Sequence, residues 1–310
     1  LKTIPLKKDT IIIQSTDPYQ YSNNPRYLFE FLSKKKMKIY WFCQNSKVEK
    51  HLKNKKLNFI SLNNPFKLIF ISLKAKIIID GGSNYYNFLN LPPKSAKKIH
   101  IGHGAANKTV LLKFYKSNVI DTYFDKFDYV NFPSNYAIEK VAKKQYKLKK
   151  NKIIKLGYPK FEELKKGRQK KRKKNKTILY TPTWRPYEYP LPIIKLKDFN
   201  IKDFRLFLKE NNITFVYSRH SINSKFDKDC IEDKENIFFI NTKKNPLFDT
   251  TKYLRSIDLL INDCSSTSIE SLFLNLPQIN IFPDLKKYTR KSGFLNEYNE
   301  NPTGPILNNY

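Results

Sequence analysis

The stretch DCSSTSIE, residues 263–270, places four hydroxyl side chains directly after an apolar run and at the predicted start of a helix. The first backbone N–H groups of a helix lack internal partners, and this end of the helix dipole is positive. A phosphate bound there would gain backbone and hydroxyl donors together. An ordinary helix cap needs only one of these serines, so both interpretations stay open. The four hydroxyls belong to Ser265, Ser266, Thr267 and Ser268, and Asp263 opens the stretch.

Glu270 lies further along the same predicted helix. Its carboxylate could accept hydrogen bonds from the ribose of a nucleotide, or it could be ordinary helix surface.

His103 lies in IGHGAANK, residues 101–108, between Gly102 and Gly104. The glycines allow a ligand or another backbone to approach closely. Because histidine titrates near neutral pH, His103 could take a proton from an attacking hydroxyl, and Lys108 could bind a phosphate. The alternative is a histidine that is satisfied within a tight turn. The glycine patterns typical of Walker and dinucleotide-binding loops are absent.

Two further strand ends carry cationic side chains. Arg219 and His220 end the apolar run ITFVYSRH and could clamp a pyrophosphate, or could be surface charge. Thr183 and Arg185 follow the run ILYT and could face a ligand in the same way.

These positions depend on a sheet that brings strand ends together. Short β-branched runs alternate with amphipathic segments along the chain, which predicts βαβ units and parallel sheets. The predicted fold class is α/β, with two Rossmann-like doubly wound domains. Ligands of such sheets bind beyond the carboxyl ends of the strands. The clearest predicted strands are residues 10–15, 38–43, 75–80, 98–102, 177–183, 213–220 and 259–263.

The basic run KKGRQKKRKKNK, residues 165–176, has no apolar periodicity and is interpreted as an exposed linker. We therefore expect an N-terminal domain over 1–164 and a C-terminal domain over 177–310. The chain begins at Leu1 and stops shortly after a Pro/Gly turn, which predicts a fragment with a segment missing beyond its C-terminus.

The formal net charge is +32, which favours an anionic partner such as a nucleic acid, a membrane surface or a phosphorylated substrate. Lysine is far more abundant than arginine, so part of this charge is expected to be solvated surface. The three cysteines are scattered and show no disulfide or metal-ligand spacing. No carboxylate cluster is evident, so we expect neither a bound metal nor a cofactor. No apolar run approaches the ~18 residues of a membrane span.

Six motifs in order resemble the CDP-glycerol glycerophosphotransferase family, which contains teichoic-acid primases and polymerases. NPRYLFEFL resembles the family's early Asn-Pro helix, and HGAANK resembles its His-Gly-x-x-x-Lys motif. The other motifs are GYPKFE (157–162), ILYTPTWR, SRHS (218–221) and the DCSST block, followed by a tail that includes Arg290.

This resemblance implies a GT-B fold whose two domains face a central cleft. It implies transfer of a polyol phosphate from a CDP-linked donor to an acceptor hydroxyl, with glycerol phosphate as the first candidate for the transferred group. The acceptor would be a lipid-linked or polymeric cell-surface glycan, and CMP would be released. His103 would be the base. His220, with the serine block, would hold the donor phosphates, so the substrate-binding set would also include Gly104, Lys108, Thr183, Arg185, Arg219, Asp263, Ser265, Ser266, Thr267, Glu270 and Arg290.

The resemblance also implies peripheral attachment to the anionic inner leaflet at the cytoplasmic face of the membrane. Four departures leave the exact donor open: Ser221 stands for proline, Cys264 for tyrosine, Lys160 for arginine and Glu162 for aspartate. Two other functions fit parts of the sequence. One is a GT-B glycosyltransferase that uses a nucleotide sugar. The other is a basic nucleic-acid-binding protein, which the absence of any recognition motif disfavours.

Overall fold

A computed structural model describes most of the chain in two compact units. The described residues are 9–15, 17, 19–82, 93–104, 123–169, 175–183, 185, 193, 196, 198–218, 232–233, 235–291 and 302–307. The first unit takes the described residues within Leu1–His103, Ser117–Phe161 and Pro246–Asp249. The second unit takes those within Gly104–Lys116, Glu162–Asn245 and Thr250–Tyr310.

The first unit is built on a parallel sheet in the order β3-β2-β1-β4-β5-β6-β7. Its strands are β1 (Thr10–Gln14), β2 (Ile39–Cys43), β3 (Phe59–Ser61), β4 (Ala75–Asp80), β5 (Lys97–His100), β6 (Tyr129–Phe132) and β7 (Ile153–Lys155).

The second unit repeats this plan with the parallel order β10-β9-β8-β11-β12-β13. Its strands are β8 (Lys176–Thr181), β9 (Ile213–Ser218), β10 (Ile237–Ile240), β11 (Leu259–Asn262), β12 (Gln278–Ile281) and β13 (Ile306–Leu307). Two parallel α/β sheets confirm the predicted fold class.

Helices connect these strands, and an asparagine side chain caps the N-terminus of three of these helices. Asn45, Asn64 and Asn200 each accept a hydrogen bond from a backbone N–H of the first turn, which satisfies one of the free donors there. The helices are α1 (Asn23–Lys34), α2 (Ser46–Asn54), α3 (Pro65–Leu73), α5 (Asn135–Ala137), a π-helical turn (Ile138–Lys143), a 3-10 turn (Lys150–Lys152), α6 (Phe161–Leu164), α7 (Ile201–Glu210), α8 (Thr250–Leu254), α9 (Ser266–Leu272) and α10 (Leu285–Lys291).

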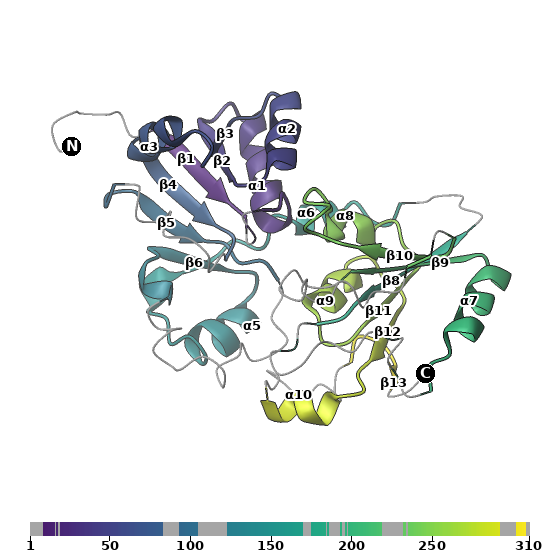
Figure 1. Cartoon of the computed structure of the whole chain (residues 1–310). Helices are drawn as coiled ribbons and strands as arrows, with labels where there is room; N and C mark the ends of the chain where they lie inside the picture. Colours follow the sequence, from purple (N-terminus) through teal and green to yellow (C-terminus); the bar gives the residue numbers. More distant parts are fainter. Residues whose placement is uncertain are drawn as a thin grey trace. The chain divides into compact units, whose positions relative to one another are not determined.

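The helices of the first unit cover both faces of its sheet. α1 and α2 pack their buried side chains against one face, where Phe29 and Leu52 meet Trp41 in a single core cluster. Because parallel crossovers are right-handed, the return from β3 to β4 carries α3 to the opposite face. Figure 1 draws α1 and α2 on one side of these strands and α3 on the other.

Each sheet reverses its strand order once, between β1 and β4 in the first unit and between β8 and β11 in the second. Ligands of open α/β sheets bind beyond the carboxyl ends of the strands at such a reversal. The segments that follow β4 and β11, together with the ends of their neighbours β5 and β8, are therefore the candidate ligand-binding positions.

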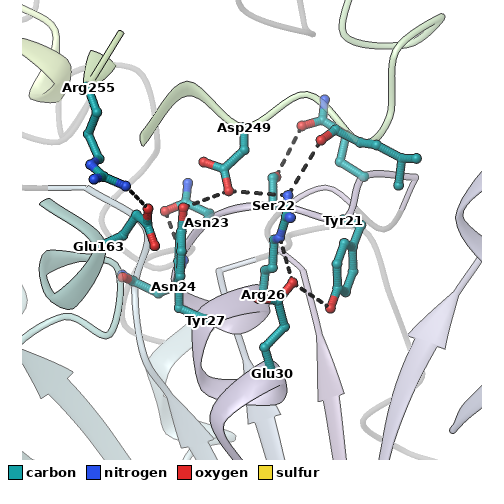
Figure 2. A network of polar contacts seen from close by, with 12 residues as sticks. Tyr21, Ser22, Asn23, Asn24, Arg26, Tyr27, Glu30, Glu163, Asp249 and Arg255 are labelled. Carbon is teal, nitrogen blue, oxygen red and sulfur yellow. Dashed lines mark hydrogen bonds and ion pairs between the residues drawn. The ribbon is translucent and has the colours of Figure 1, made fainter. Parts of the chain in front are cut away.

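Residues 246–249 belong to the first unit although the chain on both sides of them belongs to the second. Arg26 of α1 explains this placement, since its guanidinium pairs with Asp249 at 3.3 Å and with Glu30 at 3.0 Å. Tyr27 also donates to Asp249 at 2.7 Å, and Leu247 packs against the core of the first unit. Figure 2 shows Arg26 between the two carboxylates.

This anchoring corrects one sequence-based expectation. Residues 246–257 have a helical pattern in the sequence, but α8 covers only Thr250–Leu254. The carbonyl of Leu247 and the carboxylate of Asp249, just before it, instead accept hydrogen bonds from Arg26 and Tyr27 of α1. α2 was not predicted, although Val48 and Leu52 lie one turn apart on it and are both buried. His51 is half-buried in α2, and its ring centroid lies 5.5 Å from that of Tyr21.

The start of the predicted basic linker is ordered within the second unit. The backbone N–H of Gln169 donates to the carbonyl of Arg255 at 2.7 Å, and the guanidinium of Arg255 donates to the carbonyl of Gly167 at 2.8 Å. The same guanidinium pairs with Glu163 (Figure 2). Residues 170–174 lie outside the described part of the chain. The domain boundaries predicted from the sequence stay a prediction. Across the described residues, no helix has the length and apolar character needed to traverse a bilayer.

Candidate functional site

His103 lies on a turn that follows β5, and its side chain is exposed. Gly102, just before it, has a positive φ of 68°, which a residue with a side chain rarely adopts. A Cβ at this position would also lie 3.0 Å from the hydroxyl oxygen of Tyr158. The glycine before the histidine is therefore required by both backbone conformation and space.

Two buried side chains hold the backbone of this turn. The amide of Asn24 donates to the carbonyl of Gly102 at 3.0 Å, and the amino group of Lys160 donates to the carbonyl of His103 at 2.7 Å. Asn24 also accepts from the backbone N–H of Lys160 at 3.3 Å, which links the two supports. Asn24 is fully buried and Lys160 is 2% exposed. The histidine is thus presented outward from a fixed backbone.

The imidazole of His103 packs against Gly82, which follows β4. A Cβ on Gly82 would lie 3.0 Å from Nδ1 of His103 and 3.2 Å from Cε1 of His100. The φ of Gly82 is 106°, so this position also demands glycine for its backbone. His103 is therefore exposed, with its ring against the backbone of Gly82, and its role as a general base stays a prediction.

Asp80 fixes the turn that contains Gly82. Its carboxylate is fully buried and accepts from the amide of Gln14 at 2.5 Å, the backbone N–H of Gly82 at 3.0 Å and the hydroxyl of Tyr123 at 3.2 Å. His100 Nδ1 lies 3.4 Å from the same carboxylate. Burial, followed by the negative charge of Asp80, raises the pKa of Tyr123, so its hydroxyl keeps the proton that it donates.

In the second unit, the residues that follow β8 and β11 bind one another. Asp263 accepts from the backbone N–H of Thr183 at 3.0 Å and from the Thr183 hydroxyl. Arg185 donates to Asp263 at 2.8 Å and makes two parallel hydrogen bonds of 2.8 Å to Asp284. One guanidinium thus bridges two carboxylates within the second unit.

The guanidinium of Arg185 is also enclosed by aromatic rings, with Phe282 and Tyr288 each 4.8 Å away. Burial would lower its pKa, but Asp263 and Asp284 outweigh that effect and hold the pKa above its usual value. Thr183, Arg185 and Asp263 are each less than 9% exposed. These residues therefore shape the turn around Ser265, and their contact with a substrate stays a prediction.

The sequence left two interpretations open for the hydroxyls at the start of α9: a helix cap and a phosphate-binding site. Ser265 is the N-cap, since its side chain accepts from the backbone N–H of Thr267 at 3.4 Å, and its hydroxyl lies 3.2 Å from that of Thr267. Ser268 donates back to the carbonyl of Ser265 at 2.7 Å. The cap is therefore confirmed, and phosphate binding by Ser265, Ser266 and Thr267 stays a prediction.

Gly104 belongs to the second unit and lies close to Ser266. A Cβ on Gly104 would be only 2.7 Å from the hydroxyl oxygen of Ser266, so any larger residue would displace this serine. The close approach of Ser266 therefore requires glycine at position 104.

The remaining predicted residues fall into two groups. Glu270 is 4% exposed, so the surface interpretation of this carboxylate is wrong, whereas its contact with a ribose stays a prediction. Arg290 lies exposed on α10. Three predicted positions lie outside the described residues: Lys108, Arg219 and His220. Within the described ranges, no cluster of three or more His, Cys, Asp or Glu side chains could hold a metal ion.

Sequence reasoning overlooked the side chains that support these turns, namely Asn24, Asp80, Lys160 and Asp284. Asn24 and Lys160 lie in segments whose family likeness was noted, but neither was given a role. Asp80 ends an apolar strand, which is the same signal that drew attention to Asp263. A polar residue at a strand end, or in an Asn-Pro or Gly-x-Pro turn, is therefore the sequence signal that could have identified these supporting side chains.

Comparison with known proteins agrees with this fold. The family model described as CDP-Glycerol:Poly(glycerophosphate) glycerophosphotransferase matches residues 2–310. Solved structures of the wall teichoic acid polymerase TagF share the fold, with a TM-score of 0.72 for a variant that is 19% identical and covers 98% of this chain and 78% of its own. A UDP-GlcNAc 2-epimerase from Methanocaldococcus jannaschii has a TM-score of 0.54 at 12% identity, covering 96% of this chain and 88% of its own.

Among curated proteins, the teichoic acid glycerol-phosphate primase of Bacillus subtilis (strain 168) is 27% identical over 85% of this chain and 71% of its own length. The teichoic acid poly(glycerol phosphate) polymerase of the same strain is 24% identical over 98% of this chain, but the match spans only 43% of that polymerase. Since the family model covers nearly every residue, this chain belongs to the CDP-glycerol:poly(glycerophosphate) glycerophosphotransferase family.

Proposed function

We propose that this protein transfers glycerol phosphate from CDP-glycerol to an acceptor hydroxyl on a lipid-linked or polymeric cell-surface glycan and releases CMP. The family match supports the donor and the transfer chemistry. The structural observation that carries the proposal is His103, an exposed imidazole on a turn whose two carbonyls are held by buried side chains.

In the proposed reaction, the acceptor hydroxyl oxygen attacks the phosphorus that bears the glycerol. A new P–O bond forms to the acceptor, and the P–O bond to CMP breaks with its electron pair going to the CMP phosphate. His103 takes the proton of the acceptor hydroxyl, so no charge has to build up on the attacking oxygen. General bases of this kind contribute about 10²–10⁴-fold to a rate.

The second unit holds the donor in this proposal. Ser265, Ser266 and Thr267 offer hydroxyls, and Arg219 and His220 offer cationic donors for the two phosphates. These groups would neutralise the charge that develops on the departing CMP. The buried network of Arg185 with Asp263 and Asp284 supports this role indirectly, because it fixes the residues that lead into Ser265.

The test is a panel of donors in which CMP release and the mass of the product are both measured. CDP-glycerol, CDP-ribitol and a nucleotide sugar are each incubated with the protein and a lipid-linked saccharide acceptor. CMP together with a product heavier by one glycerol phosphate unit supports the proposal. Transfer of a sugar from the nucleotide sugar alone would instead identify a glycosyltransferase, and turnover with no donor would reject both.

We also propose that the protein works at the cytoplasmic face of the membrane as a peripheral protein. α3 supports this, because its outer face is apolar: Phe66, Ile69 and Phe70 are 84%, 49% and 50% exposed. The amino group of Lys74 lies 3.9 Å above the ring of Phe70, and that of Lys67 lies 5.2 Å above the ring of Phe59. Apolar side chains flanked by lysines are typical of helices that lie in a lipid interface.

The charge around α3 points the same way. The sequence from Lys50 to Ile79 holds seven lysines and no acidic residue. Each lysine close to an anionic leaflet contributes about 1 kcal/mol of attraction. The proposed surface for a lipid-linked acceptor is therefore both basic and apolar.

A further inference from the structure

The turn that carries His103 is supported by an unusual pair of buried polar residues. Lys160 is 2% exposed, and a lysine is rarely buried unless its amino group has a partner. The amino group of Lys160 donates to a backbone carbonyl, that of His103 itself, at 2.7 Å. This hydrogen bond constrains the backbone of His103, the residue proposed to act as the base.

Asn24 completes the support from another element. It lies in the first turn of α1, and its side chain joins the backbone of Lys160 to the carbonyl of Gly102. Consecutive carbonyls, those of Gly102 and His103, are therefore both directed into the protein. With both carbonyls held inward and Gly82 against the ring, the imidazole of His103 has little freedom to change direction.

We propose that Lys160 and Asn24 are positioning residues of the transfer reaction, because together they clamp the two carbonyls of the His103 turn. This inference rests on the proposed role of His103 as the base. Neither side chain needs to touch the donor or the acceptor. The clamp acts through geometry, since a displacement of about 1 Å in a reacting group can cost about 10²-fold in rate.

Lys160→Met removes the amino group at nearly constant length, and Lys160→Arg keeps a donor at the same position. We expect Lys160→Met to lower kcat about 10–100-fold, with the Kd of CDP-glycerol unchanged within about twofold because the donor is held elsewhere. Lys160→Arg, the residue that the family's motif carries here, should restore most of kcat. A role limited to general stability would not separate kcat from donor affinity in this way.

Lys155→Met is the matched control, because Lys155 lies on β7 of the same unit and its amino group makes an exposed hydrogen bond of 2.9 Å to Asn135. It should leave kcat unchanged. If Lys160→Met does not fold, Asn24→Asp tests the same clamp. It keeps an acceptor for the backbone N–H of Lys160 and replaces the donor to Gly102 with a carboxylate oxygen, which repels that carbonyl. It should lower kcat as well.

A second measurement separates failure of the clamp from failure of the proposed function. Hydrogen exchange of the peptide that spans residues 98–104 should be faster in Lys160→Met than in the wild type, whether or not CDP-glycerol is a substrate. If the wild type releases no CMP, the proposed function fails and exchange alone decides on the clamp. Unchanged exchange, or an unchanged kcat in Lys160→Met with an active wild type, would overturn the inference.

Discussion

The two units use similar turns at the carboxyl ends of their strands in opposite ways. In the first unit, the charged or polar supports are buried and act on the backbone, which leaves the side chain of His103 exposed. In the second unit, the side chains that follow β8 and β11 turn inward and bind one another, and Arg185 and Asp263 are almost fully buried. A polar residue after a strand end can therefore be either exposed to solvent or buried as part of the scaffold.

This difference predicts that substitutions in the two turns have opposite signatures. His103→Ala should lower CMP release from CDP-glycerol about 10²–10⁴-fold, because the proton of the acceptor has no base. Unfolding in urea should change by only about 0.5 kcal/mol, because the side chain is exposed. His220→Ala should also lower turnover through weaker donor binding. Unchanged turnover in both variants would remove the proposed mechanism.

The largest effect on stability should come from Arg185→Met in the second unit. It leaves the carboxylates of Asp263 and Asp284 without their cation, and breaking a buried ion pair costs about 3–5 kcal/mol. Urea unfolding measures this loss. Arg205→Met is the control, since Arg205 is 47% exposed at its side chain and pairs with Asp233, and exposed pairs are worth about 0–1 kcal/mol. Equal losses in the two variants would contradict the scaffold role.

Gly82→Ala and Gly157→Ala sharpen the comparison within the first unit. Both glycines have positive φ, so alanine should cost about 1–2 kcal/mol of stability at either position. Only at Gly82 does the new Cβ meet His103, at 3.0 Å from Nδ1, whereas nothing lies within 4 Å at Gly157. We expect kcat to fall about tenfold for Gly82→Ala alone. Steady-state kinetics on both variants would show whether the position of the imidazole matters.

The smallest expected effect concerns the surface of α3. The double variant Phe66→Ser, Phe70→Ser should weaken binding to vesicles of phosphatidylglycerol and phosphatidylcholine about tenfold, because less apolar area enters the lipid. The control is Leu206→Ser, Phe207→Ser on α7, where the two side chains are 55% and 48% exposed. Sedimentation with the vesicles measures both. If the α7 variant loses as much binding as the α3 variant, α3 is not the membrane surface.

The sequence by itself determined the fold class and the family. Runs such as TIIIQ and AKIIID became the central strands β1 and β4, because β-branched residues flanked by amphipathic segments leave few alternatives to a covered parallel sheet. The order of motifs predicted the family that the comparison then confirmed. The sequence also located the turns at Gly102 and Ser265, since glycine and serine there mark a backbone constraint and a helix cap.

Only the tertiary structure decided which polar residue in each turn is exposed and which is buried. Lys160 and Arg185 are both cations near a predicted strand or turn, and local pattern cannot say that one binds the carbonyl of His103 while the other binds two carboxylates. The partners are 57 residues from Lys160 and 78 and 99 residues from Arg185. The free energy of such groups depends on desolvation and on partners that only folding brings together, so the chain alone does not reveal it.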